Sequence, residues 1–102
     1  MSWCLYIAQA KKTGNYYVGI STDVKKRIIA HNSGKGSVMA KTQGPFELVY
    51  VSKRLSNQSV ARKIEIKIKS WNRRQKKELI TAQGIVDLRY LLKTKIRRIK
   101  KD

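Results

Sequence analysis

An excess of positive charge is the feature that most constrains how this chain can fold. Twenty-four lysines and arginines face six aspartates and glutamates among 102 residues, giving a formal net charge of +18. Like charges repel within a compact domain, so these side chains must lie on its surface and gain from salt or a polyanion. The 41% of hydrophobic residues still suffices for one core and predicts a single ordered domain. Such a charge favours nucleic acids or an anionic membrane surface as partners.

Cysteine usage and hydropathy exclude several classes of protein. Cys4 is the only cysteine, so neither an intramolecular disulfide nor a cysteine metal site can form. The first residues lack the basic segment and the apolar stretch of a secretory signal. No apolar run approaches the length of a membrane-spanning helix. We therefore expect a soluble, cytoplasmic protein.

The beginning of the chain is typical of a β-hairpin. Residues 3–8 and 16–20 are β-prone runs, and the polar connector 11–15 contains a turn glycine. Because side chains alternate along a strand, Tyr6 lies on one face of the first strand and Tyr17 on one face of the second. Their hydroxyl groups can therefore converge on the same side of the sheet.

The rest of the chain alternates helical and strand patterns. Apolar residues at helical spacing predict helices at about 24–31, 57–71, 75–80 and 85–99. Residues 46–51 are largely apolar on both faces, which predicts a strand central to a small sheet. The order hairpin, helix, strand, helix, helix indicates an α+β domain with helices packed on the sheet. We expect this domain to occupy residues 1–80, with 81–102 as a basic helical extension packed on it.

Glu65 stands out because acidic residues are scarce and this one flanks the apolar stripe of a predicted helix. An ordinary ion pair with Arg62, Lys67 or Lys69 is the interpretation that helix geometry alone favours. The functional interpretation is a metal ligand. Mg²⁺ prefers oxygen and is often held by one or two carboxylates together with water and substrate phosphate.

Four other side chains also have both a structural and a chemical interpretation. Tyr6 and Tyr17 fit a core through β-propensity, and a phenol is a base at neutral pH only if a cation or metal lowers its pKa. Arg27 and His31 lie one helical turn apart. Structurally, Arg27 fits a solvated basic face, and His31 fits the C-terminus of a helix, where a positive charge is favoured. As chemical groups, a guanidinium suits a phosphate that gains charge, and a histidine can donate to that phosphate or move protons.

The order of these residues resembles that of the GIY-YIG nuclease family, most closely its small stand-alone bacterial members. The resemblance covers about residues 3–80, and its matching segments are 4–6, 17–19, 23–32 and 61–69. It implies a three-stranded antiparallel sheet flanked by helices and an endonuclease that hydrolyses the DNA backbone. Cys4-Leu5 replaces the family's Gly-Ile, and Val18 replaces Ile, but no departure removes a residue with proposed chemistry.

The resemblance also implies a role for each candidate. Tyr6 and Tyr17 correspond to the tyrosines of the two strand motifs, and we expect Tyr6 to be the base with Tyr17 supporting it. Arg27 and His31 correspond to helix residues that contact the region of the scissile phosphate. Glu65 corresponds to the glutamate that holds the single divalent ion, Mg²⁺ or Mn²⁺. DNA repair or recombination is the expected context.

Binding is expected to depend on phosphates, because no predicted helix has the polar residues of a major-groove reader. Selection of DNA by structure rather than by sequence is what the family resemblance implies. We also expect association with the nucleoid, and a targeting protein partner is left open. The candidate phosphate contacts are Lys11, Lys12, Lys25, Lys26, Lys35, Lys41, Arg73 and Arg74. Two alternatives stay open: a basic DNA- or RNA-binding domain without catalysis, and a membrane-surface protein that binds through its basic tail.

Overall fold

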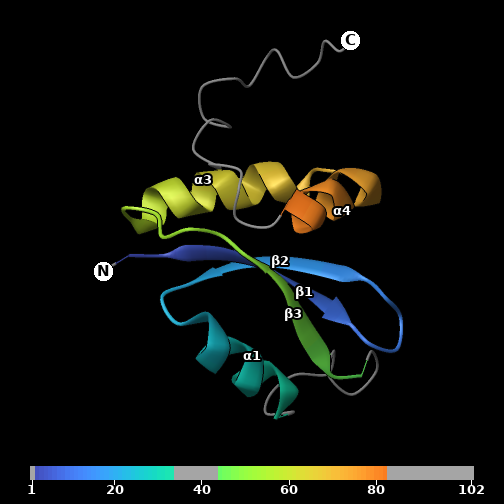
Figure 1. Cartoon of the computed structure of the whole chain (residues 1–102). Helices are drawn as coiled ribbons and strands as arrows, with labels where there is room; N and C mark the ends of the chain where they lie inside the picture. Colours follow the sequence, from blue (N-terminus) through green and yellow to red (C-terminus); the bar gives the residue numbers. More distant parts are fainter. Residues whose placement is uncertain (1, 34–43, 83–102) are drawn as a thin grey trace, which may run out of the picture.

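The computed structural model describes residues 2–33 and 44–82, which form a three-stranded antiparallel sheet with helices on both faces (Figure 1). The elements, in chain order, are β1 (Cys4–Ala10), β2 (Tyr16–Ser21), α1 (Val24–Asn32), β3 (Phe46–Val51), α3 (Gln58–Lys69) and α4 (Arg73–Ala82). Helix α1 covers one face of the sheet, and α3 with α4 covers the other. The α+β class expected from the sequence is confirmed.

Some expectations lie outside the described residues: the helix at 85–99, residues 83–102 of the expected extension 81–102, and the candidates Lys35 and Lys41. None of the helices within 2–33 and 44–82 has the length and hydrophobicity to cross a bilayer.

Strand β1 is the centre of the sheet, whose order is β2-β1-β3. The expectation that residues 46–51 form the central strand is therefore wrong, because β3 pairs only with β1 and lies at an edge. Helices cover both faces of the sheet, so an edge strand can also be apolar on both sides. The burial patterns distinguish the edge strand from the central strand: Glu47 and Val51 of β3 are exposed, whereas the first five residues of β1 are all buried.

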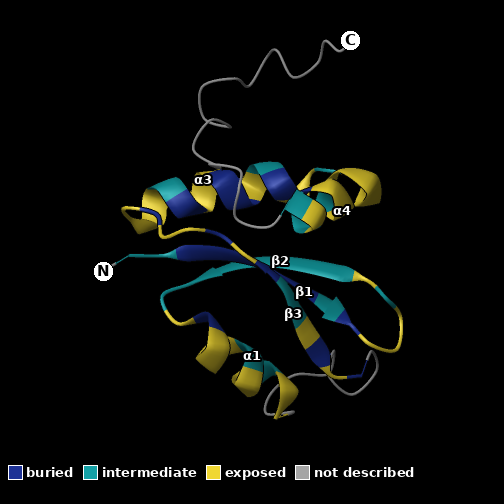
Figure 2. Cartoon of the chain, in the orientation of Figure 1, coloured by how far each residue is buried: buried dark blue, intermediate teal, exposed yellow. Residues whose placement is uncertain are grey.

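Two clusters of buried side chains hold the layers together. On one face, Leu5 and Ile7 of β1 pack with Ile64 and Ile68 of α3 and with Leu79 of α4. Complete burial of each such aliphatic side chain contributes about 1.5–3 kcal/mol. On the other face a smaller cluster joins β1 to α1 and β3, and its members are Cys4, Tyr6, Ala8, Ala10, Val24 and Phe46. Figure 2 shows the result, a dark central strand between helices whose outer sides are exposed.

Side-chain caps explain where the helices begin. The side chain of Asp23 accepts a hydrogen bond from the Lys26 amide, and that of Asn57 accepts one from the Val60 amide.

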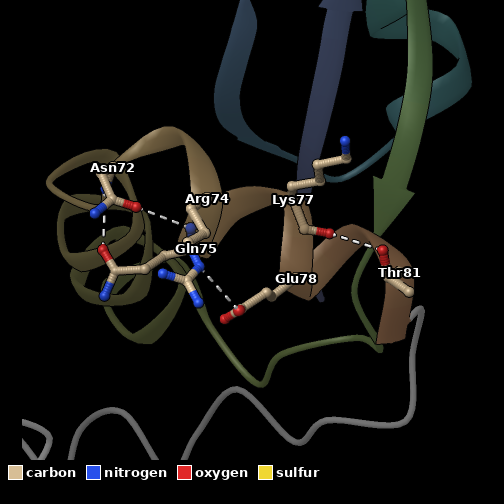
Figure 3. A network of polar contacts seen from close by, with 6 residues as sticks. All are labelled: Asn72, Arg74, Gln75, Lys77, Glu78 and Thr81. Carbon is tan, nitrogen blue, oxygen red and sulfur yellow. Dashed lines mark hydrogen bonds and ion pairs between the residues drawn. The ribbon is translucent and has the colours of Figure 1, made fainter.

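Helix α4 begins earlier than the predicted residue 75 because Asn72 and Gln75 form a reciprocal cap (Figure 3). The Gln75 amide donates to Asn72 Oδ1 at 2.9 Å, and the Asn72 amide donates to Gln75 Oε1 at 3.0 Å. Helix α3 correspondingly ends at Lys69 rather than at the predicted residue 71.

Candidate active site

Tyr6 and Tyr17 lie on the face of the sheet that α1 covers, as the alternation of strand residues predicts. Tyr6 is paired with Gly19 across the β1–β2 ladder, and Tyr17 is paired with Ala8. The Tyr6 ring lies directly over Gly19: a Cβ atom at position 19 would be 2.6 Å from Tyr6 Oη and 2.7 Å from Cζ. Only glycine leaves room for this ring, so the second strand motif provides space for the tyrosine of the first.

Phe46 brings Tyr17 and His31 together. The rings of Tyr17 and Phe46 meet edge to face with centroids 5.2 Å apart, and His31 approaches the same ring at 5.8 Å. Such aromatic pairs fix ring orientation as well as distance. Phe46 is itself buried, so it forms a rigid base for two partly exposed candidates from β2 and α1.

Arg27 and His31 lie on successive turns of α1, with Arg27 exposed and His31 half-buried. Burial lowers the pKa of His31 below its ordinary value of 6.5, and the positive charge of Arg27 lowers it further. At neutral pH the imidazole is therefore uncharged, and one of its ring nitrogens can accept a proton.

Glu65 is buried in α3 and engaged by two cations. Its Oε1 lies 3.3 Å from Nη1 of Arg62, and its Oε2 lies 3.4 Å from Nζ of Lys69. The ion-pair interpretation is thus confirmed for these two partners. Both cations have side chains that are more than half exposed, at 55% and 56%, whereas the Glu65 carboxylate is buried, so these cations can turn into solvent only if another cation takes their place at the carboxylate.

The five candidates come from both sides of the sheet. Tyr6, Tyr17, Arg27 and His31 belong to the α1 side, whereas Glu65 belongs to α3 on the opposite side (Figure 1). Both helices pack on the edge strand β2. Within residues 2–33 and 44–82, no hydrogen bond or ion pair joins Glu65 to the other four.

Comparison with known proteins now decides the family. A family model described as the GIY-YIG catalytic domain matches residues 2–78, which include all five candidates. The chain belongs to the GIY-YIG family. This is a nuclease family, and GIY-YIG nucleases act on DNA.

Small bacterial GIY-YIG proteins are similar along most of their length. A UPF0213 protein of Photorhabdus laumondii is 33% identical over 89 residues, covering 87% of this chain and 84% of that protein. A UPF0213 protein of Staphylococcus saprophyticus is 39% identical over 77 residues, covering 76% and 92%. The solution NMR structure of a UPF0213 protein from Bacillus halodurans, 34% identical, matches with a TM-score of 0.52 and covers 95% of this chain and 98% of that chain. The name UPF0213 assigns no specific activity, and the structural match supports the three-stranded α+β fold.

The chemistry of Glu65 fits the divalent ion that the GIY-YIG resemblance implies. No group of three or more His, Cys, Asp or Glu that could hold a metal occurs in the described part of the chain, and Glu65 is the carboxylate that the family resemblance assigns to the ion. Mg²⁺ accepts such a site when water and substrate phosphates complete its oxygen shell. Glu65 can present its oxygens once Arg62 and Lys69 turn away, and a phosphate is an alternative partner for both cations.

The six basic candidates in the described part of the chain are all exposed, and they differ in whether they have a partner. Lys11, Lys12, Lys25, Lys26 and Arg74 are exposed, although Arg74 Nε lies 3.7 Å from Glu78 Oε2 (Figure 3).

Arg73 has structural partners that its charge alone did not predict. Its guanidinium carbon lies 4.3 Å from the centre of the Tyr16 ring, and its Nη1 donates to the Gly14 carbonyl at 2.9 Å. It therefore ties the start of α4 to the β1–β2 turn, and its role as a phosphate contact stays a prediction.

Sequence reasoning also missed Phe46 and Asn32 as parts of this region. Phe46 was assigned only to a predicted strand, and Asn32 only to the matching segment 23–32. The Asn32 side chain bonds to the main chain of Phe46, and no periodic pattern records such a contact. The one signal that could have indicated Phe46 is an aromatic residue at the start of a predicted strand.

Proposed function

We propose that this protein is a divalent-metal-dependent endonuclease that hydrolyses phosphodiester bonds and selects DNA by structure rather than by sequence. DNA repair or recombination is the context that fits this activity. The observation that carries the proposal is the convergence of Tyr17 and His31 on Phe46, with Tyr6 and Arg27 on the same side of the sheet. Membership of a DNA nuclease family gives this cluster its chemical meaning.

Each member of the cluster has a distinct part in the proposed hydrolysis. Tyr6 takes the proton of the attacking water with Tyr17 supporting it, and the uncharged imidazole of His31 relays that proton. The guanidinium of Arg27, exposed on α1, stabilises the charge that develops on the non-bridging oxygens. Glu65 would hold the divalent ion, which polarises the phosphate and stabilises the leaving oxygen. The assignment of Tyr6 as the base stays a prediction. Tyr17, the more exposed of the two tyrosines, is the other candidate for this role.

The substitution Glu65→Ala tests the proposal. We expect cleavage in Mg²⁺ to fall by about 100-fold or more, because stabilisation of charge at the phosphate is lost. DNA affinity should change little, because the exposed lysines and arginines remain and Arg62 and Lys69 become available to phosphates. Purified protein is incubated with labelled duplex, branched, flapped and single-stranded DNA in Mg²⁺, in Mn²⁺ or with chelator, and binding is measured separately.

Glu78→Ala is the matched control. Glu78 is also a helical glutamate paired with an arginine, but its side chain is 70% exposed and lies in α4. This variant should cut like the wild type. Cleavage by Glu65→Ala at the wild-type rate in Mg²⁺ would show that the metal assignment is wrong. DNA binding without metal-dependent cleavage of any of these substrates would favour the alternative, a non-catalytic basic nucleic-acid-binding domain.

A further inference from the structure

Asn32 makes two hydrogen bonds to the main chain of Phe46. Its Nδ2 donates to the Phe46 carbonyl at 2.9 Å, and its Oδ1 accepts from the Phe46 amide at 2.7 Å. One side-chain amide thus satisfies both main-chain groups of a residue at the start of an edge strand, as a neighbouring strand would. The bonds join the last residue of α1 to the first residue of β3.

These two hydrogen bonds hold Phe46 in place more firmly than strand pairing alone would. On its other side Phe46 pairs with Ala10 of the central strand, and the adjacent Pro45 carbonyl accepts from the Lys11 amide at 3.0 Å. The start of β3 is therefore held from both sides. The Phe46 ring then projects into the cluster under α1 with little freedom to shift.

The ring that Asn32 fixes contacts two of the proposed catalytic side chains. Tyr17 meets it at 5.2 Å and His31 at 5.8 Å. His31 immediately precedes Asn32 in α1, so the same bonds also set how close the end of the helix lies to the strand. The position of the imidazole relative to the phenol of Tyr17 consequently depends on the Asn32–Phe46 connection.

We propose that Asn32 is a positioning residue of the active site, which orients Tyr17 and His31 through Phe46 without contacting the substrate. Its catalytic meaning rests on the proposed nuclease function. The structural part of the proposal, that Asn32 determines the surroundings of the His31 ring, does not depend on that function.

The variant Asn32→Ala tests the proposal, and His31 supplies the readout because it is the only histidine in the chain. Its ring signals in an NMR titration report one pKa without ambiguity. In Asn32→Ala we expect this pKa to rise towards 6.5 as the ring becomes more hydrated. The nuclear Overhauser contacts of the Phe46 ring with Tyr17 and His31 should weaken. Cleavage turnover, kcat, should fall by about 10-fold with KM nearly unchanged, because small displacements of catalytic groups are costly.

Asn57→Ala is the matched control for a general loss of stability. It removes another asparagine that accepts from a main-chain amide, but at the start of α3, away from Phe46. We expect it to leave the His31 pKa, the ring contacts and kcat at wild-type values. Asn32→Ser is a second variant for the case in which Asn32→Ala does not fold, because its hydroxyl can still accept from the Phe46 amide.

A double-mutant cycle with Phe46→Leu determines whether Asn32 acts through the ring. Leucine leaves the main-chain partners of Asn32 in place but removes the aromatic ring. If the proposal holds, the two substitutions affect kcat and the His31 pKa in a strongly non-additive way. A folded Asn32 variant with the wild-type His31 pKa and ring contacts would overturn the proposal. If the wild-type protein cuts no DNA, the proposed function fails, and the NMR measurements still decide whether Asn32 positions these rings.

Discussion

His31 is the residue whose ionisation gives the stability of this protein a pH dependence near neutrality. Burial, and then the charge of Arg27, lowers its pKa below 6.5 in the folded protein. Below pH 6.5 the unfolded chain therefore binds more protons at this residue than the folded protein does. We expect the contribution of His31 to the free energy of unfolding to be constant above pH 6.5 and to decrease as the pH falls through the lowered pKa. Urea denaturation of the wild type and of His31→Gln between pH 5 and pH 8 measures this effect, and the variant should lose most of the slope. Equal slopes in the two proteins would contradict the assignment.

The candidate residues could be identified from the sequence because their order along the chain carries the information. Tyr6, Tyr17 and Glu65 belong to short motifs whose spacing is visible without a structure. The bond between Asn32 and Phe46 could not be predicted in this way, because it joins an amide to a main chain 14 residues away. The distance between Glu65 and the tyrosines likewise depends on how two helices pack on opposite faces of the sheet, which no local pattern records.

Helix α4 depends on one arginine for its connection to the hairpin. Arg73 stacks on Tyr16 and donates to the Gly14 carbonyl, whereas its neighbour Arg74 forms an ion pair with Glu78 within the same helix. We expect Arg73→Ala to lower the free energy of unfolding by about 1–2 kcal/mol and to speed hydrogen exchange in α4. Arg74→Ala, with the same change of charge and helix propensity, should cost no more than about 0.5 kcal/mol. Equal effects of the two substitutions would show that the Arg73 contacts do not stabilise the structure.

Elements were easier to predict than their arrangement. The hairpin, the helix after Asp23 and the helix after Asn57 follow from alternation and helical periodicity, and the structure contains all three. The position of residues 46–51 in the sheet did not follow. Burial on both faces occurs in a central strand and also in an edge strand with helices on both sides. Strand order is decided by pairing between distant segments, which local patterns do not contain.

The whole molecule carries a net charge of +18, so its affinity for DNA should depend steeply on salt. If six or more phosphates are neutralised, we expect the association constant to fall by about 10³-fold or more between 50 and 200 mM salt. A plot of log K against log salt should be linear, and the double variant Lys25→Gln/Lys26→Gln should reduce its slope by about 2. Fluorescence anisotropy with a labelled duplex gives both slopes. A shallow wild-type slope would contradict binding through phosphates.

The close approach of the Tyr6 ring to Gly19 makes two separate strands interdependent. A methyl group at position 19 would overlap the phenol, so a side chain there could be accommodated only if a smaller residue replaced Tyr6. Position 19 therefore cannot diverge alone. In laboratory selection for new activities, a side chain at position 19 should appear only together with a smaller residue at position 6, and mutational libraries that vary position 19 singly should yield mostly damaged proteins.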